Sequence, residues 1–201
     1  MKTDLKQPRG EATRAEILSV ARQLFSEHGY HSTGIADIQE ATGLTKGAFY
    51  HHFRTKEDLA LAVLEEVSDD YAERLIEPAM KMDSPGERLT AMLDGVADLN
   101  CQPEWRNCQM LATLCAELTP SDERLYNTVQ QIVDNMYEIW CEMIAEGQKA
   151  GQVNGIADAQ VWAQLVINTM VGALVARKIG GGQVDLDKVV ELIKRTLIKS
   201  D

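Results

Sequence analysis

The sequence of 201 residues predicts an all-α fold, and three observations lead to that prediction. Apolar residues recur three and four positions apart along most of the chain, which is the spacing of one face of a helix. Glycine or proline stands at the ends of several of these stretches. Nowhere do apolar and polar residues alternate strictly, as they would along a half-buried strand. We therefore expect an amphipathic helix, two short helices and then a larger helical body.

The first ten residues show no apolar periodicity and are expected to form a flexible, partly basic arm over residues 1–10. The helix that follows has its apolar residues at i, i+1, i+4, i+7 and i+8: Ile17, Leu18, Ala21, Leu24 and Phe25. Gly29 is expected to end this helix. The pattern predicts one buried face and one exposed face.

Residues 33–53 predict two short helices joined by a tight turn. Ile35 and Ile38 share one face of the first, whose N-cap residue is expected to be Thr33. Gly43 supplies the permissive backbone that a tight turn needs. Two helices joined in this way can place one of them in the major groove of DNA while the other contacts the phosphates.

The second short helix is predicted to have an aromatic buried face and a polar exposed face. Phe49 and Phe53 are one turn apart and can pack inward. Lys46 and Tyr50 form an i,i+4 pair on the face left for solvent or DNA. Thr55 is expected to cap the next helix, which has an acidic first turn.

The run from Thr45 to Leu59 strongly resembles the DNA-binding domain of the TetR family of transcriptional regulators. The residues that carry the resemblance are Asp37-Ile38, Thr45, Lys46-Gly47, Tyr50, His52-Phe53, Lys56-Glu57 and Leu59. Gln39 and Gly34 depart from the family pattern, which usually has a small and a β-branched residue there. The resemblance implies an N-terminal three-helix helix-turn-helix domain followed by a helical ligand-binding and dimerisation domain.

We expect the DNA-binding domain to span residues 1–55 and the sensor and dimerisation domain to span residues 56–201. A long helix from Thr55 to about Pro78 would join the two and act as the lever between them. Further helices are expected to begin at Pro85, at Pro103 and after Ser121 as an N-cap, and to cover residues 158–179 and Leu186–Leu197.

The resemblance also implies which residues touch DNA. Those at the start of the recognition helix would approach base edges and nearby phosphates: Thr45, Lys46, Gly47 and Ala48. Those expected chiefly to contact phosphates are Tyr50, His51, Lys56 and Thr33.

The charge of the chain is distributed unevenly. The net charge is −11, of which residues 1–56 carry +2 and residues 57–201 carry −13. A mildly basic part on an acidic body would orient the molecule toward phosphates. Ordinary acidity of a cytosolic protein gives the same totals, so the asymmetry supports DNA binding without requiring it.

The family resemblance implies a homodimer formed by the last two helices, at about residues 158–199, as a four-helix bundle. Residues 158–176 carry almost no charge, which a position in the core would explain equally well. Small or polar residues that would let another helix approach closely are Asn168, Thr169, Gly172, Ala173 and Ala176. Two recognition helices held about 34–36 Å apart meet successive major grooves. An inverted-repeat operator in double-stranded DNA is therefore the expected partner.

An inducer site between the middle helices is implied in the same way. The candidate lining residues are Trp105, Met110, Leu111, Leu114, Met136, Tyr137, Trp140 and Met143, although aromatics and methionines at helical spacing also suit a plain core. The stretch around Cys108 resembles a subgroup typified by the repressor of N-ethylmaleimide reductase, in which a cysteine reacts with electrophiles or oxidants. Arg106 and the helix N-terminus would favour the Cys108 thiolate, and Glu104 would oppose it. A buried, inert thiol is the alternative.

Other classes of function find little support. The four cysteines form no CxxC pair, so neither a zinc site nor a disulfide framework is indicated, and no metal or cofactor is expected. No catalytic motif stands out, so we do not expect an enzyme. A helical protein-binding adaptor would leave Lys46, Tyr50 and Lys56 unexplained. No apolar run is long enough to span a bilayer and Met1–Arg9 is polar, which predicts a cytoplasmic protein.

Together these features predict a ligand- or electrophile-responsive transcriptional repressor. It would bind a palindromic operator as a homodimer and be released by an inducer. A transcriptional activator is the alternative among regulators.

Overall fold

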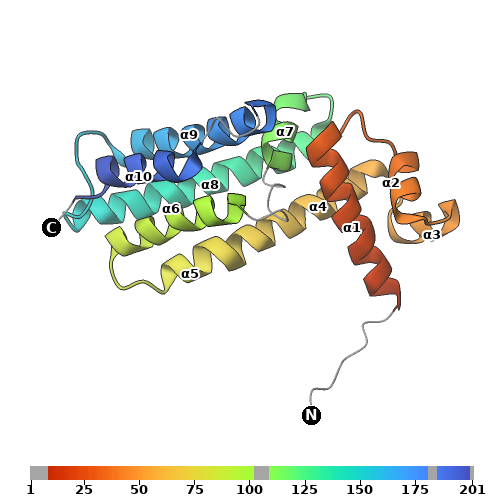
Figure 1. Cartoon of the computed structure of the whole chain (residues 1–201), viewed down its shortest axis with the longest axis horizontal. Helices are drawn as coiled ribbons and strands as arrows, with labels where there is room; N and C mark the ends of the chain where they lie inside the picture. Colours follow the sequence, from red (N-terminus) through yellow and green to blue (C-terminus); the bar gives the residue numbers. More distant parts are fainter. Residues whose placement is uncertain (1–8, 102–108, 181–184, 200–201) are drawn as a thin grey trace, which may run out of the picture.

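The computed structural model describes residues 9–101, 109–180 and 185–199 (Figure 1). Within these ranges the backbone is helical apart from turns, loops and an isolated antiparallel bridge between Val153 and Ile198, so the all-α prediction is confirmed. No helix in these ranges is both long enough and apolar enough to cross a membrane.

Three helices form one end of the molecule, which we call the head: α1 (Arg9–His28), α2 (Ile35–Thr42) and α3 (Lys46–His52) (Figure 1). The sequence correctly predicts where α1 and α2 end. Gly29 and Gly43 have φ angles of +89° and +65°, in the left-handed region that favours glycine. Each glycine therefore stops one helix and lets the next begin in a new direction.

The prediction that Thr33 caps α2 is wrong. The N-cap residue is Gly34, whose N–H donates to the carboxylate of Asp37 at 2.7 Å. Thr33 is buried, and its hydroxyl donates to the carbonyl oxygen of Gly29 at 2.7 Å. The α1–α2 turn brings the Gly29 carbonyl close to the Thr33 hydroxyl. This hydroxyl therefore stabilises the turn and does not cap α2.

A continuous helical stretch leads from the head into the rest of the chain: α4 (Lys56–Tyr71), the π-helical turn η1 (Ala72–Ile76) and α5 (Glu77–Met80). It begins as predicted, with the Thr55 hydroxyl accepting from the N–H of Asp58 at 3.0 Å. It continues past Pro78, where the sequence predicts its end. Proline has no N–H to donate to the carbonyl four residues back. Just before it, the Glu77 N–H bonds to the carbonyl of Ala72, five residues back, which widens the turn.

Among the described residues five further helices follow: α6 (Pro85–Cys101), α7 (Gln109–Glu117), α8 (Glu123–Lys149), α9 (Ala159–Gly180) and α10 (Leu186–Leu197). The helix start at Pro85 is confirmed, whereas the start predicted at Pro103 lies outside the described residues. The N-cap residue of α8 is Asp122, not Ser121. The Ser121 hydroxyl instead lies 2.6 Å from the hydroxyl of Thr119, because the loop before α8 directs it toward that residue and away from the helix end.

Two hydrophobic cores hold the helices together. The first packs the head against α4, α7 and the N-terminal half of α8, around Phe25, Phe49 and Leu114. The second packs η1, α5 and α6 against the C-terminal half of α8, α9 and α10, around Trp140 and Met92. The division between residues 55 and 56 stays a prediction, but the first core ties the head closely to α4 and α7.

Candidate functional site

The recognition helix predicted from the sequence corresponds to α3, which is anchored by its aromatic side chains. The Thr45 hydroxyl accepts from the N–H of Ala48 at 3.3 Å and so starts the helix. Phe49 is fully buried and Phe53 nearly so, with their ring centroids 6.3 Å apart. Since both rings enter the first core, the opposite face of α3 is left outside.

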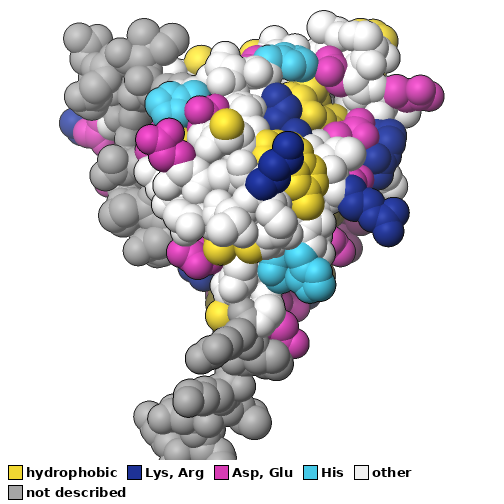
Figure 2. Space-filling model, turned by 90° about the vertical axis from the view of Figure 1, so that its right-hand side faces the viewer, with side chains coloured by type: hydrophobic (Ala, Val, Ile, Leu, Met, Phe, Trp, Pro, Cys, Tyr) yellow, Lys and Arg dark blue, Asp and Glu magenta, His cyan; other side chains and the backbone are white. Residues whose placement is uncertain are grey.

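The exposed face of α3 carries most of the residues predicted to approach DNA. Lys46, Gly47 and His51 are exposed, and Ala48 is half-buried. Tyr50 has 41 % of its surface exposed, and the Lys46 ammonium lies 6.0 Å from the centre of its ring. Figure 2 looks onto this end of the molecule, where Lys, Arg and His side chains lie beside hydrophobic ones. Donors of this kind can meet phosphates and base edges.

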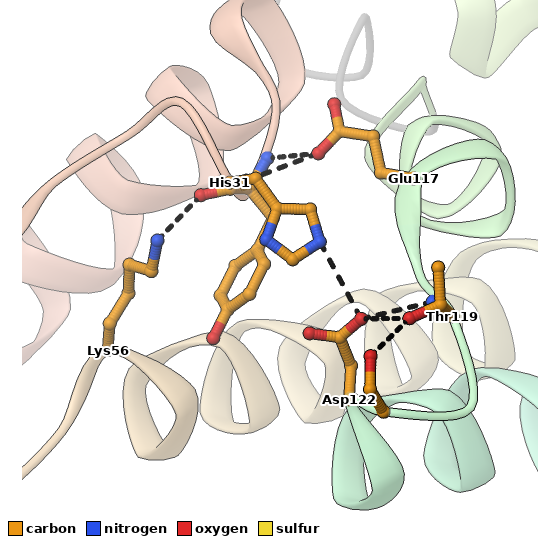
Figure 3. Close-up of polar contacts among 7 residues, drawn as sticks. His31, Lys56, Glu117, Thr119 and Asp122 are labelled. Atoms are coloured by element: carbon orange, nitrogen blue, oxygen red, sulfur yellow. Dashed lines mark hydrogen bonds and ion pairs between the residues drawn. The ribbon is translucent and has the colours of Figure 1, made fainter.

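Two other residues predicted to contact DNA are engaged within the protein. The Lys56 ammonium donates to the carbonyl oxygen of Tyr30 at 2.9 Å (Figure 3). It also donates to the carbonyl oxygen of Thr33 at 3.1 Å and lies 4.3 Å from the centre of the Tyr30 ring. Partial burial lowers the pKa of Lys56, although the carboxylates of Glu117 and Asp122 act in the opposite direction. The Thr33 hydroxyl also points inward. Both side chains hold the α1–α2 turn, so we leave them out of the proposed DNA contacts.

A second candidate site is a cavity of about 490 Å³ where the two cores meet. Its walls come from α4, η1, α6, α7, α8 and α9. Four of the predicted sensor residues line it: Leu111, Met136, Tyr137 and Trp140. Trp105 and Cys108 lie outside the described residues. The prediction is wrong for Met110, Leu114 and Met143, which are buried in the two cores and do not line the cavity. The helical spacing of apolar residues thus located a wall of this cavity.

The cavity has few polar groups, and most of those are already paired. The Tyr137 hydroxyl donates to Oδ1 of Asn168 at 2.6 Å, and the indole N–H of Trp140 donates to the Tyr71 hydroxyl at 3.2 Å. Cys115 is exposed by surface area, yet protein atoms around its thiol desolvate it and raise its pKa. No Asp, Glu, Lys, Arg or His is found among the described lining residues. An uncharged molecule would therefore fit this cavity better than an ion.

Both parts of the chain match family models. Residues 17–63 match "Bacterial regulatory proteins, tetR family", and residues 85–193 match "Tetracyclin repressor-like, C-terminal domain". The chain belongs to the TetR family. It is accordingly a transcriptional regulator and not an enzyme.

Relatives of this TetR-family chain match it over most of its length. The HTH-type transcriptional repressor AcnR of Corynebacterium diphtheriae is 25% identical over 93% of this chain and 92% of its own. The crystal structure of a TetR transcriptional regulator from Chloroflexus aurantiacus has a TM-score of 0.81 and 26% identity, covering 96% of this chain and 99% of that one. The reduced form of E. coli NemR has a TM-score of 0.75 and 19% identity, covering 92% of this chain and 97% of its own. At this identity the comparison shows that the chain and NemR share a fold, and it does not show that they share a chemical activity.

Sequence reasoning missed several residues that form the cavity of this TetR regulator. Ser68 and Tyr71 line it from α4, which was interpreted only as a lever. Asn168 was assigned to a dimer surface, although it also lines the cavity. A polar residue inside a nearly uncharged helix was the available signal in that case. For α4, Ser68 and Tyr71 lie three apart on the helix face that also carries Val67 and Leu75, and this spacing could have indicated the cavity face.

Proposed function

We propose that this TetR-family regulator is a transcriptional repressor that binds an inverted-repeat operator as a homodimer. An inducer that is neutral and mainly apolar enters the cavity and releases the DNA. The observation that carries the proposal is the exposed polar face of α3, on a helix whose aromatic face is fixed in the core.

The start of α3 supports direct contact with the duplex. Thr45, Lys46 and Ala48 would face base edges and nearby phosphates, and Tyr50 would contact phosphate. A Cβ at Gly47 would meet no protein atom within 4 Å, so packing within the chain does not require glycine there. A missing side chain on an outward-facing turn instead leaves room for a phosphate backbone to approach. His51, which is exposed on the same helix, adds a further donor toward phosphate.

The operator can be isolated by selecting duplexes from a random pool with the wild-type protein. Lys46→Ala should then weaken binding at fixed salt by at least about tenfold, with an unchanged free energy of unfolding. Lys149→Ala, at an exposed lysine in the last turn of α8, removes the same charge far from α3 and should leave binding unchanged. Equal binding by Lys46→Ala and wild type would refute this placement of α3.

A stripe on α9 supports the homodimer. Val161, Leu165, Asn168, Gly172 and Val175 are spaced i, i+4, i+7, i+11 and i+14, and all are exposed. Val161 and Leu165 each leave about half of their surface in water. A second copy of α9 could approach closely at Gly172 and cover the apolar residues on either side. Two heads on one dimer can then meet successive major grooves.

The uncharged walls of the cavity support a neutral inducer. An ionised group buried there without a partner would lose its hydration, which costs several kcal/mol. A matched pair of probes tests this, namely 1-decanol and decanoate at the same free concentration. The alcohol should raise the melting temperature and weaken operator binding more than the carboxylate does. An equal or larger effect of decanoate would refute the assignment.

A further inference from the structure

The sensor part of the chain holds the turn between α1 and α2 through one carboxylate (Figure 3). Glu117 is the last residue of α7, and its Oε2 accepts from the N–H of Tyr30 at 2.8 Å and from the N–H of His31 at 3.2 Å. Both N–H groups lie just after the end of α1, in the turn that leads to α2. We call these two hydrogen bonds the Glu117 contact.

Gly29 makes room for the Glu117 contact. A Cβ atom at residue 29 would lie 1.9 Å from Oε1 of Glu117 and 2.8 Å from its Cδ. The φ angle of +89° already favours glycine at this position. The same residue thus ends α1 and lets a carboxylate from another part of the chain reach the turn.

Other elements hold the same turn from different sides. Lys56 of α4 donates to the Tyr30 carbonyl oxygen at 2.9 Å. At the start of α8, Oδ2 of Asp122 lies 3.7 Å from Nε2 of His31 and accepts from the N–H of Thr119 at 3.0 Å. The α1–α2 turn is therefore a place where α4, α7 and α8 all contact the head (Figure 3).

The helix that carries Glu117 also forms a wall of the cavity. Leu111, Ala112 and Cys115 of α7 line the cavity, while Leu114 is fully buried in the first core. At 1.5 Å per residue, Ala112 and Glu117 are about 7.5 Å apart along the helix axis. A short hydrogen-bonded helix shifts as a unit, so a displacement on its cavity side reaches Glu117.

We propose that Glu117 is the positioning residue through which occupancy of the cavity changes the orientation of the head. This rests on the proposed function, because it takes the cavity as the inducer site and α3 as the recognition helix. α4 offers another route, since Val67, Ser68 and Tyr71 also line the cavity. Removing the carboxylate separates the two, because it breaks the route through α7 and leaves α4 intact.

Amide hydrogen exchange tests the Glu117 contact itself, without DNA or inducer. In Glu117→Ala, exchange at the Tyr30 and His31 amides should be at least about tenfold faster than in wild type. Glu117→Gln keeps one acceptor oxygen and should be intermediate. Glu142→Ala removes the same charge from an exposed position on α8 and should match wild type. Equal exchange in Glu117→Ala and wild type would overturn the inference.

A double-mutant cycle tests the coupling. Ala112→Phe fills part of the cavity and stands in for an inducer, and operator dissociation constants are measured on the selected duplex. Alone, it should weaken binding by about 5- to 150-fold, the usual range of allosteric coupling. Combined with Glu117→Ala, its effect should fall to about twofold or less. Val133→Phe, which fills the cavity from α8, repeats the test if Ala112→Phe does not fold.

The outcomes are distinct. If Ala112→Phe weakens operator binding equally with and without Glu117→Ala, the coupling runs through α4 and the inference is overturned. If Ala112→Phe alone leaves operator binding unchanged, the inference is also overturned, because filling the cavity then has no effect on the head. If no duplex is selected at all, the proposed function fails, and the exchange experiment still decides whether Glu117 restrains the turn.

Discussion

Replacing Gly29 with alanine combines two physical effects at one position. The backbone at φ +89° costs an alanine about 1–2 kcal/mol. The new Cβ would also lie 1.9 Å from Oε1 of Glu117. Because that carboxylate ends a flexible side chain, it can swing away, and the loss is then its hydrogen bonds from Tyr30 and His31. Near the surface these contribute about 1.5–3 kcal/mol together, so Gly29→Ala should lower the free energy of unfolding by about 2.5–5 kcal/mol.

Gly43→Ala is the matched control for the backbone effect. Gly43 has a φ of +65°, and a Cβ there would meet no atom within 4 Å. The alanine variant therefore carries backbone strain alone, about 1–2 kcal/mol. The difference between the two variants isolates the displacement of the carboxylate.

The assay is urea unfolding followed by circular dichroism, on both single variants and on Gly29→Ala combined with Glu117→Ala. Once the carboxylate is absent, Gly29→Ala should cost only the backbone strain, so the two changes should not add. The reasoning is refuted if Gly29→Ala costs the same with and without Glu117. It is also refuted if Gly29→Ala costs no more than Gly43→Ala.

Three further predictions concern acid stability, association and sensing. A backbone N–H that donates to Asp122 lowers the pKa of its carboxyl group, so its stabilisation is complete above about pH 4 and is lost as the pH falls. Urea titrations at several pH values should show a shallower acid loss of stability in Asp122→Asn than in wild type, and equal slopes would contradict this. Leu165→Asp should give monomers in sedimentation velocity, while Met82→Asp, at an apolar side chain exposed outside α9, should remain dimeric. If Cys108 senses electrophiles, Cys108→Ser should bind operator but resist release by quinones. Cys115→Ser should be released normally, because burial raises the pKa of the Cys115 thiol; normal release of Cys108→Ser would exclude the idea.

The helix ends that the sequence predicted correctly depend on local chemistry. Gly29 and Gly43 adopt a backbone that other residues avoid, and the Thr55 hydroxyl reaches an N–H only three residues away. Phe49 and Phe53 are buried because they share a face of one short helix. In each case the determining contact lies within a few residues, so the pattern of residue types was sufficient.

The contacts that the sequence did not predict share the opposite cause. Thr33 has the right residue type for an N-cap, but the folded turn offers its hydroxyl a carbonyl at Gly29. Lys56 stands among basic residues near the recognition helix, yet its ammonium is taken by carbonyls of the α1–α2 turn. The partner of Glu117 lies 87 residues earlier in the chain. Contacts of this kind depend on how helices pack, which residue spacing does not specify.

The packing of the head determines how a signal from the cavity can act. Ile38 of α2 and Phe49 of α3 have no exposed surface, so the recognition helix cannot shift without α1. An inducer that moved α4 and α7 together would carry the head as a rigid body, whereas one that moved them apart would have to break a tie to the turn. Lys56 donates two partly buried hydrogen bonds and packs over an aromatic ring, while one of the two Glu117 bonds is exposed. Because water can replace an exposed hydrogen bond at little cost, the tie to α7 is the weaker of the two, and a displacement of α7 can turn the head only while the Glu117 contact holds.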